Sequence, residues 1–161
     1  MQLFRSILKS FYYAFRGLWK MIQTERNFRI HLTAIMYVII FAFFYGLDGT
    51  QWAILFLTFG IVPSIEIINS SIENAVDIKT REQNSGARNA KDFAAAAVLV
   101  SAIASVAVAI SLFSEKEKLI NALQITFSPP WIIILAASLF PIFIFIRGGK
   151  KDKKNLTKRI K

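Results

Sequence analysis

The sequence predicts an all-α integral membrane protein with four membrane-spanning helices behind a helix on the membrane surface. Hydrophobic residues make up 55% of the chain, they gather in four long blocks, and most charged residues lie outside those blocks. About 20 apolar residues cross a bilayer as an α-helix, and lipid offers backbone groups no hydrogen-bond partners, so blocks of this length should be helical. The blocks are residues 32–47, 52–72, 93–113 and 131–146.

The N-terminal segment, at about residues 3–24, predicts an amphipathic helix in the membrane interface. Its apolar residues recur at helical spacing, and its basic residues lie mostly on the opposite side, which is typical of a surface-bound helix. The apolar set is Phe4, Ile7, Leu8, Phe11, Phe15, Leu18 and Ile22, and the basic set is Arg5, Lys9, Arg16 and Lys20.

The rest of the chain is divided by its apolar blocks. Residues 1–114 form a membrane core, residues 115–148 an outer loop with a fourth span, and residues 149–161 a basic tail. Within the core, the three spans are expected at about residues 30–47, 51–76 and 92–114.

Local residues explain how these spans begin, bend and pack. Asp48 and Gly49 predict a tight turn after span one. Gly60 and Pro63 should bend span two. Span three is rich in Ala, and small residues allow helices to approach closely in lipid, so we expect it to pack against other helices.

The formal net charge of +10 indicates topology rather than nucleic-acid binding. Lys and Arg are concentrated before span one, between spans two and three, and in the tail, whereas the other loops carry no excess of positive charge. The positive-inside rule therefore places both termini and the 78–92 loop in the cytoplasm. The chain contains no Cys, which excludes disulfides and thiolate metal sites.

A row of polar residues in span two is the strongest functional signal. Glu66, Asn69, Glu73 and Asp77, with Ser70 beside them, share one helix face, because their spacing confines the first four to an arc of roughly 80°. A carboxylate in hydrocarbon costs a few kcal/mol, so it is rarely kept without a task. Glu66 lies about 21 Å into a core about 30 Å thick. The row therefore runs from hydrocarbon depth to the cytoplasmic surface.

This arrangement suits a reaction between a lipid hydroxyl and a water-soluble anion. Glu66, in the cytoplasmic part of the membrane, could accept the hydroxyl proton as a general base. Carboxylates nearer water could hold Mg²⁺ together with Glu25, which precedes span one. Lys91, next to Asp92 at the start of span three, could neutralise charge on a transferring phosphoryl group.

Other interpretations remain open from the residues alone. The polar face could hydrogen-bond to a neighbouring subunit, and ordinary solvation could explain the ionisable residues at span ends. A cation or proton transporter would use the same carboxylates, but the outer half of span two offers only Thr58 between Trp52 and Gly60. A non-catalytic membrane subunit would bind no nucleotide. His31, the single His, favours a structural role.

Three segments resemble the small prokaryotic diacylglycerol kinase family, whose Gram-positive-type members phosphorylate undecaprenol. They are ERNFRIH at 25–31, EIINSSIENAVD at 66–77 and AKDFAAAAV at 90–98, and the resemblance covers about residues 4–114. It implies three spans with a surface helix, a bacterial cell membrane, Mg-ATP as donor, and a homotrimer with active sites between subunits. The fourth span departs from this pattern.

The resemblance also implies residue roles. Glu66 would be the proton acceptor, Glu25 and Glu73 would bind Mg²⁺, and Asn69 would support that site. The implied nucleotide contacts are Tyr13, Glu25, Glu73, Asp77, Glu82, Asn84, Lys91 and Asp92, with Lys91 and Asp92 also in the catalytic set. The implied lipid contacts besides Glu66 are Ser10, Ala14 and Ala95.

The sequence thus predicts an ATP-dependent lipid kinase that acts at the cytoplasmic leaflet and has no nucleic-acid partner. Undecaprenol is the preferred substrate because ERNFRIH resembles the Gram-positive branch of the family. Nothing in the motifs separates undecaprenol from diacylglycerol by chemistry, so a diacylglycerol kinase is the alternative.

Overall fold

The computed structural model describes residues 2–79 and 84–148; the basic tail lies outside the described residues. Within these ranges the chain is helical apart from short connections. The helices are α1 (Gln2–Thr24), α2 (Arg26–Tyr45), α3 (Gly49–Lys79), α4 (Ser85–Leu112), α5 (Lys116–Thr126) and α6 (Pro129–Arg147). By length and composition α2, α3, α4 and α6 could each cross a membrane. The predicted all-helical fold is therefore confirmed for the described residues, with four candidate spans.

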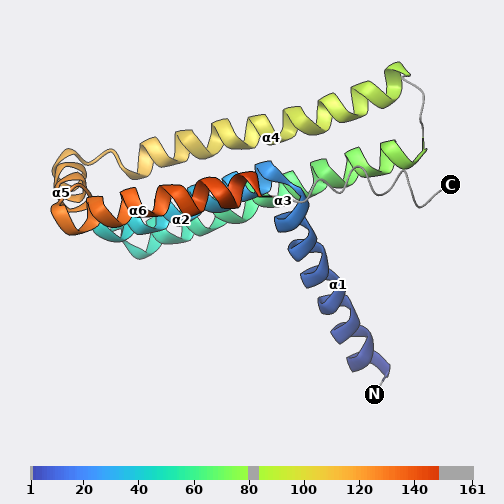
Figure 1. Ribbon diagram of the computed structural model, residues 1–161, viewed down its shortest axis with the longest axis horizontal. Helices are drawn as coiled ribbons and strands as arrows, with labels where there is room; N and C mark the ends of the chain where they lie inside the picture. Colours follow the sequence, from blue (N-terminus) through green and yellow to red (C-terminus); the bar gives the residue numbers. More distant parts are fainter. Residues whose placement is uncertain (1, 80–83, 149–161) are drawn as a thin grey trace.

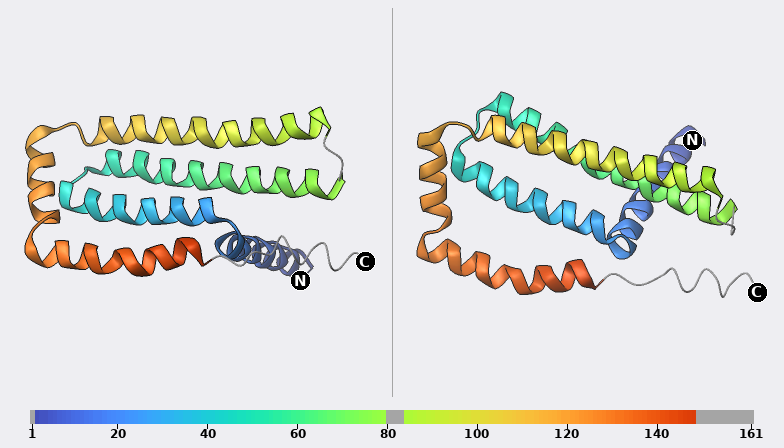
Figure 2. Two further views of the ribbon diagram at one scale, coloured as in Figure 1. Left: turned by 45° about the horizontal axis from the view of Figure 1, so that its top comes forward. Right: turned by 90° about the horizontal axis from the view of Figure 1, so that it is seen from above.

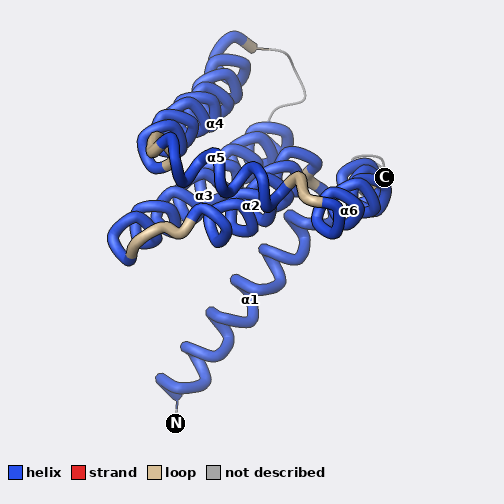
Figure 3. Tube along the Cα trace, turned by 90° about the vertical axis from the view of Figure 1, so that its left-hand side faces the viewer, coloured by secondary structure: helices blue, strands red, loops and turns tan. Residues whose placement is uncertain are grey.

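The four long helices run side by side, and the short α5 crosses one end of the bundle (Figures 1 and 2). α3 packs against α4, and α2 packs against α3, α5 and α6. α1 leaves the bundle at the end of α2 that is far from α5, and it projects to one side (Figures 1 and 3). α1 is therefore held mainly where it joins α2.

A hydrophobic cluster closes the α5 end of the bundle. The ring of Phe113 lies against those of Phe41 and Tyr45, with centroid distances of 5.2 and 5.0 Å. The Tyr45 hydroxyl accepts a hydrogen bond of 2.9 Å from the backbone N–H of Glu115. Apolar packing thus joins the helices at this end, which leaves the opposite end for polar groups. The buried members are Ala42, Tyr45, Leu47, Leu55, Leu112 and Ala122.

Several boundaries differ from the sequence prediction. α2 begins at Arg26 and α4 at Ser85, both earlier than expected. In each case the polar residues that precede the apolar block are also helical. α3 runs through Pro63 to Lys79 as one helix. The predicted outer loop contains α5, which packs Leu119 and Ala122 onto the hydrophobic cluster.

The turn between α2 and α3 lies slightly earlier than predicted. Gly46 adopts a left-handed φ of 74° and ends α2, whereas Gly49 already belongs to α3. Asp48 caps α3: its carboxylate accepts from the Gln51 backbone N–H at 2.9 Å, and its own N–H donates to the Gln51 side chain at 3.0 Å. This reciprocal pair satisfies donors that a helix start leaves free.

Substitution of Gly46 should destabilise the bundle without steric conflict. A Cβ at this position would meet no atom within 4 Å, but the left-handed conformation costs a non-Gly residue about 1–2 kcal/mol. We expect Gly46→Ala to lower the thermal unfolding midpoint in detergent, and Gly49→Ala, which also meets no atom within 4 Å, to leave it nearly unchanged. Equal midpoints for the two variants would contradict this explanation.

Candidate functional site

The C-terminal half of α3 contains most of the buried polar side chains among the described residues. Glu66, Asn69 and Ser70 are 2%, 7% and 4% exposed, respectively. Their helical spacing turns them to one side of α3, whereas the buried residues toward the other end of α3 are the apolar Leu55 and Val62. The part of the polar row at Glu66, Asn69 and Ser70 is therefore enclosed, whereas Asp77 at its end is exposed.

Two of these buried groups lack partners within the described part of the chain. Glu66 Oε2 and Asn69 Oδ1 make no hydrogen bond there, although Asn69 Nδ2 donates to Glu73 Oε1 at 3.3 Å. Buried polar atoms are nearly always paired, and an unpaired one costs about 1–3 kcal/mol. Each of these two oxygens can therefore still accept a hydrogen bond.

Glu25 joins this face from the junction of α1 and α2. It is the N-cap residue of α2 and has extended backbone angles, and its carboxylate accepts a 3.2 Å hydrogen bond from the Thr24 hydroxyl. The charged groups near the Glu66 carboxyl are Glu25 and Glu73, and the Asn27 side chain lies beside it. A carboxylate from the α1–α2 junction thus lies near the two carboxylates of α3.

A cleft of about 540 Å³ separates α1 from α3 next to these carboxylates. It includes three residues predicted from the sequence: Tyr13, Ala14 and Glu25. It also includes residues that sequence reasoning did not assign to the site, namely Gly17, Leu18, Lys20, Met21, Thr24, Ile67, Ser70, Ser71 and Asn74.

The α3 members of this cleft carry a signal that the sequence analysis did not use. Ser70 and Asn74 follow Glu66 at four-residue steps, so they flank the carboxylate row on the same helix. Ser70 was noted in the row without a role, and Asn74 was passed over. The Asn74 side chain donates to the Ser70 carbonyl at 2.7 Å, which leaves its amide oxygen available on the cleft side of α3.

Lys91 and Asp77 form an ion pair between α4 and α3. Both side chains are partly exposed, so the pair stabilises the packing only modestly. The pair lies near the C-terminal end of α3 and the N-terminal end of α4. The sequence analysis predicts both of its residues in the nucleotide site. Asp92, the next residue, is exposed.

Other predicted residues are not brought to the cleft. Asn84 caps α4, and its side chain accepts from the Ala87 backbone N–H at 2.7 Å. Ser10 on α1 and Ala95 on α4 are exposed and do not line the cleft. Glu82 lies outside the described residues.

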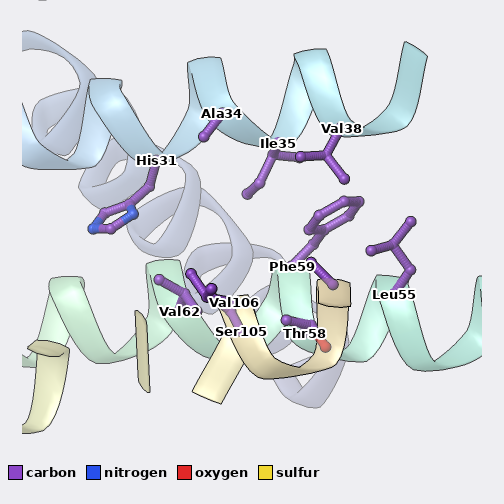
Figure 4. Close-up of a pocket in the computed structure, with 11 residues that line it drawn as sticks. His31, Ala34, Ile35, Val38, Leu55, Thr58, Phe59, Val62, Ser105 and Val106 are labelled. Atoms are coloured by element: carbon purple, nitrogen blue, oxygen red, sulfur yellow. The ribbon is translucent and has the colours of Figure 1, made fainter. Parts of the chain in front are cut away.

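An apolar cavity of about 220 Å³ lies between α2, α3 and α4, further along the α3 face that carries Glu66. Figure 4 shows His31, Ile35 and Val38 of α2 opposite Phe59 and Val62 of α3. Val62 is one helical turn from Glu66. The face therefore changes from carboxylates to hydrocarbon within a short distance.

The donor set fits a cation shared with phosphate better than a metal caged by protein alone. No group of three or more His, Cys, Asp or Glu side chains in the described residues is arranged to hold a metal. Mg²⁺ commonly takes one or two carboxylates, with substrate phosphates and water completing its shell. Glu25 and Glu73 could supply such a pair.

The fold and this site define a helical, multi-pass membrane protein with buried polar groups on α3 and a cleft between the side helix α1 and the bundle. Comparison with known proteins gives the family. Residues 12–113 match the prokaryotic diacylglycerol kinase family, slightly less than the range expected from the motifs, and the chain belongs to that family. It is therefore a lipid kinase with ATP as phosphoryl donor.

Curated relatives support the same assignment. The chain is 41% identical to the undecaprenol kinase of Bacillus subtilis over 108 residues. This match covers 67% of this chain and 88% of that protein. It is 39% identical over 104 residues to a diacylglycerol kinase of Synechocystis, covering 64% and 59%. The diacylglycerol kinase of Escherichia coli K12 is 31% identical over 103 residues, covering 64% and 84%. α5 and α6 lie beyond the family match.

Proposed function

We propose that the chain phosphorylates undecaprenol with ATP at the cytoplasmic leaflet of a bacterial cell membrane. The observation that carries this proposal is the buried Glu66 carboxylate, one oxygen of which has no hydrogen-bond partner among the described residues. On α3 it lies between Val62, which lines the apolar cavity, and Ser70, which lines the polar cleft. A lipid alcohol needs such a boundary, because its hydroxyl must meet ATP while its chain stays in hydrocarbon. The relative named undecaprenol kinase supports this choice of lipid.

In the proposed reaction the lipid hydroxyl oxygen attacks the γ-phosphorus of ATP. The new bond joins that oxygen to phosphorus, the bond between phosphorus and the ADP oxygen breaks, and Glu66 takes the hydroxyl proton. Asn69 holds Glu73 through its amide. Glu25 and Glu73 would hold Mg²⁺, which offsets negative charge on the phosphates when bound.

The nucleotide would occupy the α1–α3 cleft and the neighbouring ends of α3 and α4. Tyr13 lines this cleft, and Lys91, while held by Asp77, could also contact a phosphate. Asp92, Asn84 and Glu82 complete the proposed nucleotide set, and the capping bond of Asn84 makes it a weaker member. Asp77 would orient Lys91.

The lipid would approach along α1. We propose that α1 lies in the membrane interface, because Phe4, Phe11 and Phe15 on it are exposed and such a set gains free energy in lipid. Ser10, Ala14 and Ala95 are the proposed lipid contacts, and the cavity below Glu66 offers space for the first isoprenoid units of the chain.

The functional assembly would be a homotrimer. The exposed apolar residues of α4, among them Val100, Ile103 and Ile110, form a surface that a second chain could cover. In this proposal residues 1–114 form the kinase core, residues 115–148 add α5 and α6, and both termini face the cytoplasm.

A diacylglycerol kinase is the second candidate, favoured by the names of the Synechocystis and Escherichia coli relatives. A transporter is less favoured, because the buried residues of α3 nearer its N-terminus, Leu55 and Val62, are apolar and offer an ion no polar path.

Competition between the two lipids tests the proposal directly. Purified protein in vesicles that contain equal amounts of undecaprenol and diacylglycerol should transfer labelled phosphate from ATP mainly to undecaprenol. Preferential labelling of diacylglycerol would make the second candidate correct. Ion flux without ATP, and no labelled lipid, would contradict both.

A further inference from the structure

α6 lies antiparallel along α2, and three side-chain contacts join them from one end to the other (Figure 2). Successive contacts step back along α2 as they step forward along α6, as two antiparallel packed helices require. None of the residues of α6 is buried, so α6 meets the bundle along this narrow stripe. The contacts are Phe44 with Trp131 (centroids 4.9 Å), Tyr37 Oη with Ser138 Oγ (2.7 Å) and Arg29 Nη2 with the Ile146 carbonyl (2.9 Å).

The third contact also involves α1. Arg29 is 3% exposed, and its other terminal nitrogen donates to the carbonyls of Ile22 and Gln23 at 2.8 and 3.2 Å. These carbonyls belong to the last turn of α1, and the Ile146 carbonyl belongs to the last turn of α6. One guanidinium thus caps two helix ends, where free carbonyls and the helix dipole favour a cation.

We propose that α6 braces the side helix α1 through Arg29 and so fixes one wall of the cleft between α1 and α3. Arg29 is a positioning residue in this proposal, since its guanidinium donates to backbone carbonyls of α1 and α6. Arg29 holds the C-terminal end of α1, just before Glu25. Because α1 forms one wall of the cleft, the angle at which α1 leaves this end sets the width of the cleft. The importance of that width for turnover rests on the function proposed above; the brace itself does not.

The chemistry of the contact requires arginine. A guanidinium presents five N–H groups in a rigid plane and can donate to carbonyls of two different helices, whereas a lysine ammonium is a point charge on a flexible stem. Arg29→Lys therefore keeps the charge but loses the fixed link between α1 and α6.

A cross-linking experiment tests whether α6 docks on α2 of its own chain. The chain has no Cys, so Tyr37→Cys with Ser138→Cys introduces a single pair. A short bifunctional thiol reagent should join this pair within one chain, and Ile39→Cys with Ser138→Cys, whose α2 position is turned by about 200°, should react far less. Exclusive formation of cross-linked dimers by the first pair would overturn the proposal.

A distance measurement tests the brace. Spin labels at Trp19→Cys and Ile78→Cys, both exposed positions, report the separation of α1 and α3 when labelled chains are diluted with unlabelled ones. We expect one narrow distance in the parent chain and in Arg26→Lys, a change of the exposed neighbouring arginine. Arg29→Lys should broaden or shift it, and raise the KM for ATP more than it lowers kcat.

A second variant protects this test against a folding failure of Arg29→Lys. Ser138→Leu disturbs the α2–α6 stripe far from α1 and should broaden the same distance to a lesser extent. An unchanged distance in both variants would overturn the brace. Because the distance is measured without substrate, a failure of the undecaprenol assignment would leave it unaffected.

Discussion

Glu66→Gln should nearly abolish phosphate transfer to lipid, with a loss of about 10²–10⁴-fold in kcat, the range that a general base contributes. Glutamine keeps the size and polarity of the side chain, but it cannot accept the hydroxyl proton. The substitution should not weaken the fold, because the glutamine amide oxygen can still accept a hydrogen bond from the Asn27 side chain. Labelled phosphate in extracted lipid is the measurement.

A matched variant separates the chemistry from the loss of charge. Glu117→Gln changes an exposed carboxylate of α5, on the opposite end of the bundle from the cleft, and should keep full turnover. Both proteins should insert and elute from a sizing column like the parent. Turnover by Glu66→Gln close to that of Glu117→Gln would rule out Glu66 as the proton acceptor.

Glu73→Gln should lower turnover by about 10²-fold or more at ordinary Mg²⁺ concentrations, because a metal ion supplies several kcal/mol of charge stabilisation. The glutamine oxygen can still accept the hydrogen bond from Asn69 that Glu73 accepts at 3.3 Å, so the geometry of the face is retained. Turnover as a function of Mg²⁺ concentration is the measurement.

The dependence of turnover on Mg²⁺ concentration distinguishes a metal ligand from a general base. Additional Mg²⁺ should partly restore Glu73→Gln, since a weaker site fills at higher concentration, whereas it should not restore Glu66→Gln. Parent-like turnover with an unchanged Mg²⁺ dependence would show that Glu73 holds no metal. Glu25→Gln should behave as Glu73→Gln does.

The spans could be predicted because hydropathy acts over long blocks. Lipid requires about 20 apolar residues for each crossing, and four helices of that kind are present. α5 was predicted as a loop because Lys116, Glu117 and Lys118 begin a segment that is short and charged; its helix depends on Ala122 and Leu119 packing against the hydrophobic cluster. The periodicity of a short segment does not predict a contact with residues distant in the sequence.

The site was predictable where one helix defines it. Glu66 and Asn69 are buried on one face of α3, as their spacing required. Lys20, Ser71 and Asn74 were missed because the cleft depends on the angle between α1 and α3, and no periodicity within either helix contains that angle. Arg29 was counted only as a positive charge near the membrane, since nothing in ERNFRIH indicates that α6 would end beside it.

The contacts of α6 also order the events of biosynthesis. Tyr37 and Ser138 are 101 residues apart, and Arg29 and Ile146 are 117 apart, whereas α3 and α4 are neighbours in the chain. A chain that emerges from the ribosome N-terminus first can pair α3 with α4 while the side of α2 that α6 later covers still faces lipid. The contact of α6 with α2 therefore forms last. A helix could be added there during evolution without disturbing how the earlier helices assemble.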